Sequence, residues 1–502
     1  MGIFQSFQPL LQSETHEKNP PAKQRSRLSP RQASKIKQRD VSAQKRVIAA
    51  QQRKKTALVY EMHRTIFQHF PHLLDWMRQV DDRRKKASDY ELAAHLTACL
   101  ALFLFKSESR NQYNHYRGDA QFAENYQRLF GFAMPHGDSV HNVMAQFNED
   151  QIEHLKHQMV QVLLRRKTFH GSRYRGKWFL VAVDASGVGS YAHQRDAQCL
   201  HRTSKTGKIT YFHTVLEARL VTAGGFSVSI ASQWIENPEG TDYDKQDCER
   251  KAFTRLATKL KQIYPRLPIM ILADGLYPYE GFFNTCKANG WAYCVTFKDG
   301  NLPSVWEEVR SLMPLQGANT HQEIRHQPSG ATTQQAFRWV EGVDYQGHTL
   351  QWLECRETFT PKATADNTSA PSSKITHFVH LTDLPVNWRN IAATSHSGRL
   401  RWKIENEGFN TLKNQDYGMK HQYARKSYRA LKNYFQFMQM AHLIHQLMTL
   451  TTRFKESFLS GQNHPTLKNL WRDLIAAMQW GELDTQELEH VAGTCAQFRF
   501  ST

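Results

Sequence analysis

Two apolar runs of the sequence each end in an aspartate: FLVAV is followed by Asp184, and MILA is followed by Asp274. If these runs are neighbouring parallel strands, their ends lie about 5 Å apart and both carboxylates reach one point. Buried carboxylates that close repel each other and become protonated unless a cation neutralises them. Mg²⁺ prefers oxygen ligands of this kind beside phosphate groups. The pair therefore predicts a metal site, although either aspartate alone is better explained as the cap of a turn.

A third carboxylate, Glu405, lies in the basic stretch RWKIENEGFNTLKN, residues 401 to 414. Apolar residues that recur every four positions predict the inward stripe of a helix: Leu400, Ile404, Gly408 and Leu412. Arg401 and Glu405 are i, i+4 neighbours on the adjacent stripe, so Glu405 can point at a metal while basic residues hold DNA phosphates. Three acids suit a two-metal site for in-line displacement at phosphorus. The alternative is an ordinary surface pair of arginine and glutamate.

The chain of 502 residues has a formal net charge of +19, with 40% apolar and 22% charged residues. Such a composition is typical of a soluble globular protein, and the charge indicates a polyanionic partner. Nucleic acid is favoured over an anionic membrane because no strongly basic amphipathic helix stands out. Five basic residues near Glu405 are predicted to bind DNA: Arg401, Lys403, Lys413, Lys420 and Arg425.

In this order, Asp184, Asp274 and RWKIENEGF resemble the DDE transposases of bacterial insertion sequences, and more narrowly the group marked by Tyr-x2-Arg-x3-Glu-x6-Lys around the third acid. The likeness covers roughly residues 175 to 430. The resemblance implies an RNase H-like catalytic fold that uses Mg²⁺, for which Mn²⁺ can substitute. It also implies a homodimer on paired DNA ends in the bacterial cytoplasm. Asp184, Asp274 and Glu405 are then the catalytic metal ligands, and the motif arginine is Arg401.

Two positions depart from that motif. The tyrosine falls on Gly398, so its phosphate contact is absent or supplied by another residue, such as His396. The lysine position is occupied by Leu412, and Lys413 comes one residue late, which turns it about 100° away on an ideal helix. A π-bulge at Gly408 would restore the expected face.

The elements that position these residues predict an α/β fold: an RNase H-like catalytic core, a mostly β insertion between the second Asp and the Glu, and helical N-terminal and C-terminal regions. Strand-like runs begin at residue 178, and the order is β-β-β-α-β-α-β. Residues 171–300 and 375–433 form the predicted core, 301–374 the insertion and 434–502 the C-terminal helical region.

Residues 56–170 show helical periodicity and are either a DNA-binding domain or plain helical support. A helix-turn-helix is one interpretation of the runs around the turn MPHGDS, where Asp138 or Ser139 is the expected helix cap. Residues 17–55 are rich in Lys and Arg and have too few apolar side chains to fold alone, so residues 1–55 are predicted to be a DNA-binding arm or, alternatively, a solvated tail.

In the β insertion, Trp339 and Trp352 lie in alternating strands. We predict that Trp352 faces the core and that Trp339, beside Arg338, lies nearer the DNA, where an aromatic ring can stack on a base. The alternative is that both tryptophans fill the core of the insertion.

Several protein classes are disfavoured by the sequence. The start has no secretory signal pattern, and the longest apolar run, residues 93 to 105, is too short to span a bilayer. The seven cysteines are scattered, and Cys199 with His201 has no second ligand pair at metal-site spacing. An active transposase is the leading hypothesis. An RNase H-like nuclease without strand transfer and a catalytically silent, transposase-derived DNA-binding protein are the alternatives.

Overall fold

The computed structural model describes residues 52–500, apart from positions 83, 85–87, 239–245, 363–372, 422, 425, 462–463 and 495–497. Its contacts divide the chain into the units Met1–Arg53 and Lys54–Thr502. Nearly all of the predicted arm and Arg425 lie outside the described residues. All structural features below belong to the second unit.

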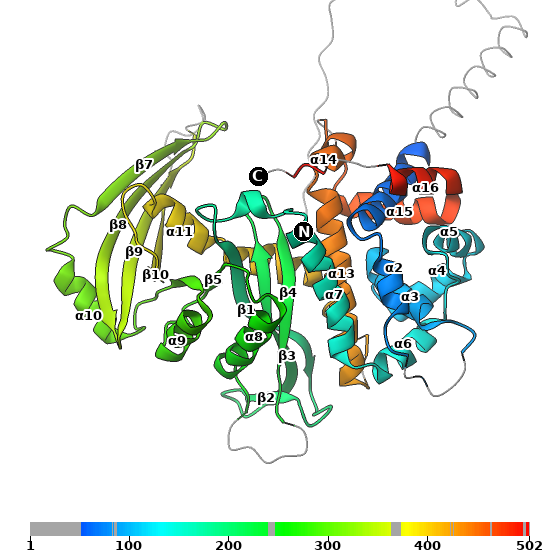
Figure 1. Ribbon diagram of the computed structural model, residues 1–502, viewed down its shortest axis with the longest axis horizontal. Coiled ribbons are helices and arrows are strands. Elements are labelled where there is room, and N and C mark those ends of the chain that lie inside the picture. The colour runs from blue at the N-terminus through cyan, green and yellow to red at the C-terminus, as the bar shows by residue number, and fades with distance from the viewer. Residues whose placement is uncertain are drawn as a thin grey trace, which may run out of the picture. The chain divides into compact units, whose positions relative to one another are not determined.

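One sheet contains the ten described strands, in the order β2-β3-β1-β5-β6-β10-β9-β8-β7, with β4 also paired to β3 (Figure 1). The strands are β1 (Phe179–Tyr191), β2 (Leu200–Thr203), β3 (Ile209–Val221), β4 (Ser227–Ile235), β5 (Ile269–Ala273), β6 (Ala292–Thr296), β7 (Thr320–His326), β8 (Thr332–Tyr345), β9 (His348–Thr360) and β10 (Lys374–Thr382). Among these pairs β1–β5 and β5–β6 are parallel, and the others are antiparallel.

The predicted α/β class is confirmed. The β3–β4 hairpin forms across residues 222–226, and β5 is buried along its whole length, as its continuous apolar sequence predicts. One expectation is corrected: β1 does not end at Asp184 but continues to Tyr191, paired with β3. The extension is stable because β3 supplies backbone hydrogen-bond partners beyond the point where β5 stops.

The predicted β insertion forms β7, β8 and β9 together with helix α10 (Pro303–Leu312), and it extends the same sheet. The link is β10, which pairs with β6 on one edge and with β9 on the other. The insertion is therefore hydrogen-bonded directly to the strands that follow the second aspartate.

The expected place of Trp339 is corrected by the structure. Trp339 is 5% exposed and packs in a small apolar cluster with Phe337 and Leu353, while Trp352 is 1% exposed in the main core, as predicted. Arg338, whose position suggested that Trp339 faces DNA, is the exposed neighbour and pairs with Glu354 on the adjacent strand. Adjacent residues of a strand point to opposite faces, so an exposed Arg338 requires the ring of Trp339 to turn inward.

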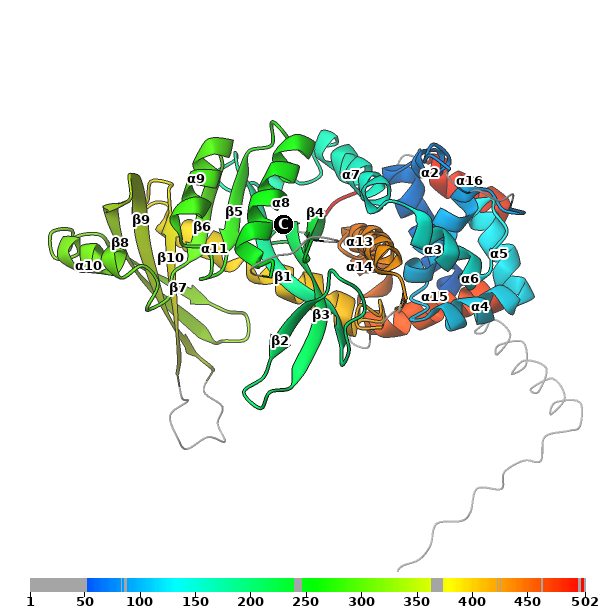
Figure 2. The same ribbon diagram turned by 90° about the horizontal axis from the view of Figure 1, so that it is seen from below.

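Helices cover both faces of the central strands. Helices α8 (Glu249–Ile263) and α9 (Glu280–Asn289) lie together on one face (Figure 2). Phe283 of α9 contacts Tyr293 of β6, whereas α11 (Ile391–Arg399) approaches the next residue, Cys294. Because these neighbouring residues point to opposite faces, α11 covers the other side of the sheet.

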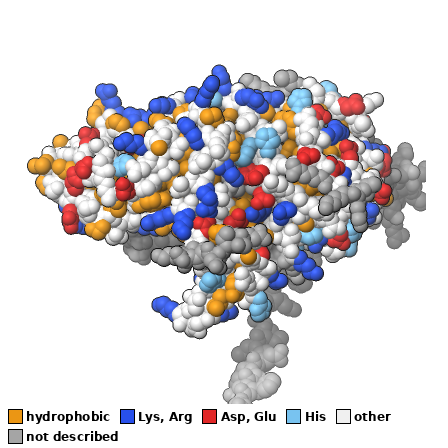
Figure 3. All heavy atoms as spheres, turned by 60° about the horizontal axis from the view of Figure 1, so that its bottom comes forward, with side chains coloured by type: hydrophobic (Ala, Val, Ile, Leu, Met, Phe, Trp, Pro, Cys, Tyr) orange, Lys and Arg blue, Asp and Glu red, His pale blue; other side chains and the backbone are white. Residues whose placement is uncertain are grey.

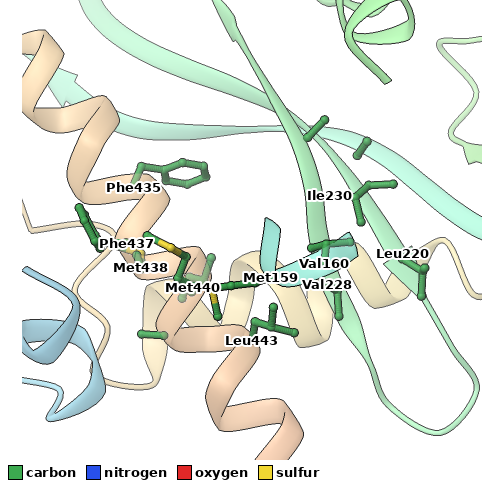
Figure 4. Close-up of a cluster of buried hydrophobic side chains, with 14 of the residues drawn as sticks. Met159, Val160, Leu220, Val228, Ile230, Phe435, Phe437, Met438, Met440 and Leu443 are labelled. Atoms are coloured by element: carbon green, nitrogen blue, oxygen red, sulfur yellow. The ribbon is translucent and has the colours of Figure 1, made fainter. Parts of the chain in front are cut away.

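A helical region packs beside β4. It contains the helical residues 54–69 and α2 (Leu73–Arg78), α3 (Leu92–Leu104), α4 (Arg110–Gly118), α5 (Ala120–Phe130), α6 (Gly137–Gln146), α7 (Glu149–Arg165), α13 (Tyr428–Thr449), α14 (Thr452–Phe458), α15 (Leu467–Trp480) and α16 (Thr485–Gly493). Helices α7 and α13 lie against β4, and Figure 4 shows Met159 of α7, Met440 of α13 and Val228 of β4 in one buried cluster. The N-terminal and C-terminal helical segments thus share a core with the sheet.

The predicted cap of α6 is corrected. His136, rather than Asp138 or Ser139, is the N-cap, and its side chain accepts from the backbone N–H of Asp138. The hydroxyl of Ser139 instead lies 2.8 Å from Nε2 of the buried His95 in α3. Helices α5 and α6 flank the turn that suggested a helix-turn-helix. Helix α5 contacts α15, and α6 contacts α3 and α13, as helical support requires. DNA binding by α5 and α6 stays a prediction. Within the described ranges, every helix is too short or too polar to cross a bilayer.

Candidate active site

The two predicted aspartates lie side by side where the parallel pairing of β1 and β5 ends. Ala182 pairs with Leu272, and Asp184 and Asp274 each follow two residues later. With neighbouring strands about 4.8 Å apart, this register puts both residues at the same level of the sheet. One backbone N–H donates to each carboxylate, at 2.9 Å for Asp184 and 2.8 Å for Asp274.

Arg401 joins Asp184 to Glu405. Its Nη1 lies 2.7 Å from Oε1 of Glu405 and 3.5 Å from Oδ2 of Asp184. Arg401 is buried, and its Nε has no hydrogen-bond partner among the described residues. The predicted i, i+4 contact is therefore present, but it is not an ordinary surface pair. Arg401, which is 217 positions from Asp184 in the sequence, thus brings its positive charge between the carboxylates of Asp184 and Glu405.

A fourth carboxylate, Glu249, was missed by the sequence analysis. It is the first residue of α8, and the hydroxyl of Tyr277 donates to its Oε1 at 2.8 Å. Burial raises the pKa of Glu249, and the negative charge of Asp274 raises it further. The available signal was an acid in the first turn of the helix between the two aspartate-bearing strands. That signal is weak because acids favour helix N-termini in general.

Burial raises the pKa of Asp184 to about 7, and the charges of Glu405 and Glu249 act in the same direction. Arg401 lowers this pKa but does not offset the burial. Near neutral pH, Asp184 therefore holds a proton for about half of the time unless a further cation is present. Asp184, Asp274, Glu405 and Glu249 offer hard oxygen donors of the kind that Mg²⁺ and Mn²⁺ prefer, although no three of these described carboxylates have oxygen atoms that all lie within 4.8 Å of one another.

We expect the substitution Asp184→Asn to stabilise the metal-free protein at alkaline pH. The carboxyl has a pKa of about 7 when folded and about 3.9 when unfolded, so stability falls as pH rises through this window. Asparagine does not ionise, so the variant does not lose this stability. For wild type the loss in unfolding free energy reaches up to about 4 kcal/mol at pH 8. Urea unfolding with a chelator should show the variant more stable than wild type at pH 8 and similar at pH 4. Equal stabilities at pH 8 would contradict the burial argument, and added Mg²⁺ should reduce the difference.

The predicted π-bulge is present as a π-helix, η2 (Ile404–Asn410), followed by α12 (Thr411–Asn414). A Cβ at Gly408 would lie 3.0 Å from Nε of the buried Arg219, which explains why glycine occupies this position. The wider turn rotates Lys413 back toward the site. Its Nζ donates to Oγ of Ser186 on β1 at 2.6 Å. Burial and the charge of Lys420 lower the pKa of Lys413, and the nearby Asp184 offsets only part of this effect.

The other two described basic residues predicted to bind DNA, Lys403 and Lys420, contact neighbours in their own segment. Lys403 pairs with Glu407 on the same helix, and the exposed Lys420 donates to Asn414. Gly398, in place of the motif tyrosine, packs so tightly that a Cβ would lie 2.7 Å from the ring of His380. No larger residue fits there without rearrangement. His396, the suggested substitute, is exposed on α11.

A cavity of about 810 Å³ opens beside β6 and β10 and reaches the start of the Glu405 segment. Its lining includes Phe378 of β10, Trp402, and the cations Lys298 and Arg399. Trp402 is 54% exposed, and the guanidinium of Arg399 lies 4.0 Å from the ring centre of Phe378. Aromatic rings next to cations suit a nucleic-acid base and its phosphate.

On the face shown in Figure 3, Lys and Arg side chains spread over several parts of the surface and are interspersed with acidic ones. The positive charge on this face is therefore not gathered into one patch. A comparison of the chain with models of known protein families finds no match, and a comparison with curated proteins also finds none.

Proposed function

We propose that this protein is a DNA transposase with an RNase H-like catalytic core. The order β4-β3-β1-β5-β6, with three antiparallel strands followed by two parallel ones, supports this core. The mostly β segment between Asp274 and Glu405 stands where the resemblance to DDE transposases requires it. The proposal includes cytoplasmic action on double-stranded DNA by a homodimer that holds two transposon ends.

The observation that carries the proposal is the meeting of Asp184, Arg401, Glu405 and Lys413 beside Asp274. Strand register brings the two aspartates together, and Arg401 connects the first of them to the glutamate. Lys413 donates to Ser186, which lies on β1 two residues after Asp184. Carboxylates for a divalent cation next to phosphate-binding cations are what phosphoryl transfer requires.

Asp184, Asp274 and Glu405 would hold Mg²⁺, and Glu249 lies close enough to raise the pKa of Asp184. When bound, the cation supplies the positive charge that stabilises the transition state at phosphorus. Arg401 holds Asp184 and Glu405 in place before DNA binds. Lys413 presents ammonium N–H groups to a phosphate oxygen, and Trp402 offers a ring on which a base near the cut can stack.

The direct test uses duplexes of the two sequences that flank the coding region, together with a supercoiled target plasmid and Mg²⁺. Cleavage at the ends followed by joining of the 3′ hydroxyl to the plasmid is the expected result. Cleavage without joining would favour the nuclease alternative. Specific end binding without any cleavage would favour the silent DNA-binding protein, a result that the loss of the motif tyrosine at Gly398 would help to explain.

The contribution of the basic arm is tested by deletion. Residues 54–69 are helical and belong to the second unit, where Lys55 pairs with Asp473 at 3.0 Å, so the deletion should stop at residue 50. We expect normal thermal unfolding, weaker DNA binding, and a shallower slope of log affinity against log salt, by about 0.9 for each lost phosphate contact. An unchanged slope would identify the arm as a solvated tail.

A further inference from the structure

Three side chains of different chemistry meet outside the candidate active site: the carboxylate of Asp196, the thiol of Cys199 and the imidazole of His213. All their ligand atoms lie within 4.8 Å of one another. His213 is on β3, paired with Gly189 of β1. Gly189 is five residues beyond Asp184, roughly 16 Å along the strand. This cluster is thus separate from the carboxylates proposed for catalysis.

Two of the three spacings among these groups, both measured from His213, approach those of tetrahedral zinc. Nε2 of His213 lies 3.3 Å from Sγ of Cys199 and 3.1 Å from Oδ1 of Asp196. Bond lengths of about 2.3 Å to sulfur and 2.0–2.1 Å to nitrogen and oxygen predict tetrahedral edges of roughly 3.5 and 3.3 Å. A shift of about 0.2 Å per contact would therefore admit the ion.

The histidine ring is already oriented as a metal ligand requires. Its other nitrogen, Nδ1, lies 3.1 Å from the hydroxyl of Tyr191, and the ring stacks on Tyr428 of α13 with centres 4.1 Å apart. A metal-binding imidazole commonly donates its second N–H to such a partner, which leaves the first nitrogen free for the ion. In the absence of a metal, Nε2 faces both Asp196 and Cys199 but carries at most one proton.

The chemistry of the three groups selects the ion. A thiolate disfavours Mg²⁺ and Ca²⁺, whereas one sulfur, one nitrogen and one oxygen ligand suit Zn²⁺. With a neutral imidazole, the thiolate of Cys199 and the carboxylate of Asp196 balance the two positive charges of Zn²⁺. The site then has no net charge, which makes its burial less costly. Cys199 and His213 are each 2% exposed, but the carboxylate of Asp196 is 23% exposed, so a fourth position can open to water.

We infer that Asp196, Cys199 and His213 form a zinc site that fastens the segment between β1 and β2 onto β3. The sequence pattern directed attention to His201 instead, two residues from Cys199. Strand pairing decides otherwise: Leu200 pairs with Phe212, so Cys199 lies opposite His213, while His201 lies opposite Tyr211 and is exposed.

The test measures zinc in the purified full-length protein after dialysis against excess Mg²⁺, which occupies the carboxylate site. We expect about one retained zinc per chain. After exchange with Co²⁺, a thiolate-to-cobalt charge-transfer band should appear, which a site made only of carboxylates does not produce. Cys199→Ser should remove this band, whereas the exposed Cys248 provides the matched control, since Cys248→Ser should keep it.

Two milder variants keep the inference testable if Cys199→Ser does not fold. Asp196→Asn removes a partly exposed ligand, and Tyr191→Phe removes only the partner of Nδ1. Tyr191→Phe should weaken zinc binding about 10- to 100-fold and leave the charge-transfer band at saturating Co²⁺. A wild-type protein that retains no zinc and develops no thiolate band would overturn the inference and identify the cluster as a hydrogen-bonded group only.

Discussion

Replacing Glu405 by glutamine is expected to lower the rate of DNA cleavage by roughly 10³-fold, the effect of losing about 4 kcal/mol of transition-state stabilisation. Glutamine keeps the size of the side chain and a hydrogen-bond acceptor for Arg401, but it removes the negative charge that would hold the cation. Asp184→Asn and Asp274→Asn should have effects of the same order. Single-turnover cleavage of labelled end DNA measures each rate, and affinity for the same DNA in the presence of Ca²⁺ should change little.

Glu407 provides the matched control. It lies two residues along the same π-helix and pairs with Lys403 rather than Arg401. Glu407→Gln removes the same charge from the same segment, so general electrostatic effects on DNA binding are reproduced. We expect near-normal cleavage by this variant. If both variants cut normally, Glu405 is not a ligand of the catalytic metal.

The tryptophans of the β insertion are expected to affect stability rather than DNA processing. Trp352 is 1% exposed and meets Trp306 edge to face, with ring centres 6.0 Å apart, while Trp339 is 5% exposed in its own cluster. Trp352→Ala and Trp339→Ala should each cost about 3–5 kcal/mol of unfolding free energy. Urea denaturation followed by circular dichroism measures this loss.

Trp402 is the contrasting position because the residue is 54% exposed and lines the cavity beside β6 and β10. Trp402→Ala should leave the melting temperature nearly unchanged and weaken binding of cleaved ends by about 1–3 kcal/mol, roughly 5- to 150-fold. A similar exposed residue, Trp388, lies outside the residues that line the cavity, and Trp388→Ala should change neither property. Early melting of the Trp402 variant would show that its ring packs instead of stacking on DNA.

The sequence by itself determined the features that depend on local pattern. Apolar runs predicted the strands that carry Asp184 and Asp274, because a strand buried on both faces is apolar along its length. The spacing of Arg401 and Glu405 predicted their contact, since residues four apart share one face of a helix. Together with the resemblance to the transposase motif, which expects the lysine one residue earlier, the position of Lys413 predicted the π-helix, because an extra residue in the turn returns that side chain to the expected face.

Tertiary structure alone decided the features that depend on which segments become neighbours. Glu249 joins the acidic site because the start of α8 meets Tyr277 and Asp274, which follow β5, and nothing in its local sequence separates it from other helix-starting acids. His213, not His201, faces Cys199 because of the β2–β3 register. Trp339 turns inward because an apolar cluster that joins the insertion to Val386 and Ile391 buries it, and an arginine neighbour does not reveal which face is covered. Local spacing limits which groups can share a face, but only long-range pairing brings two faces together.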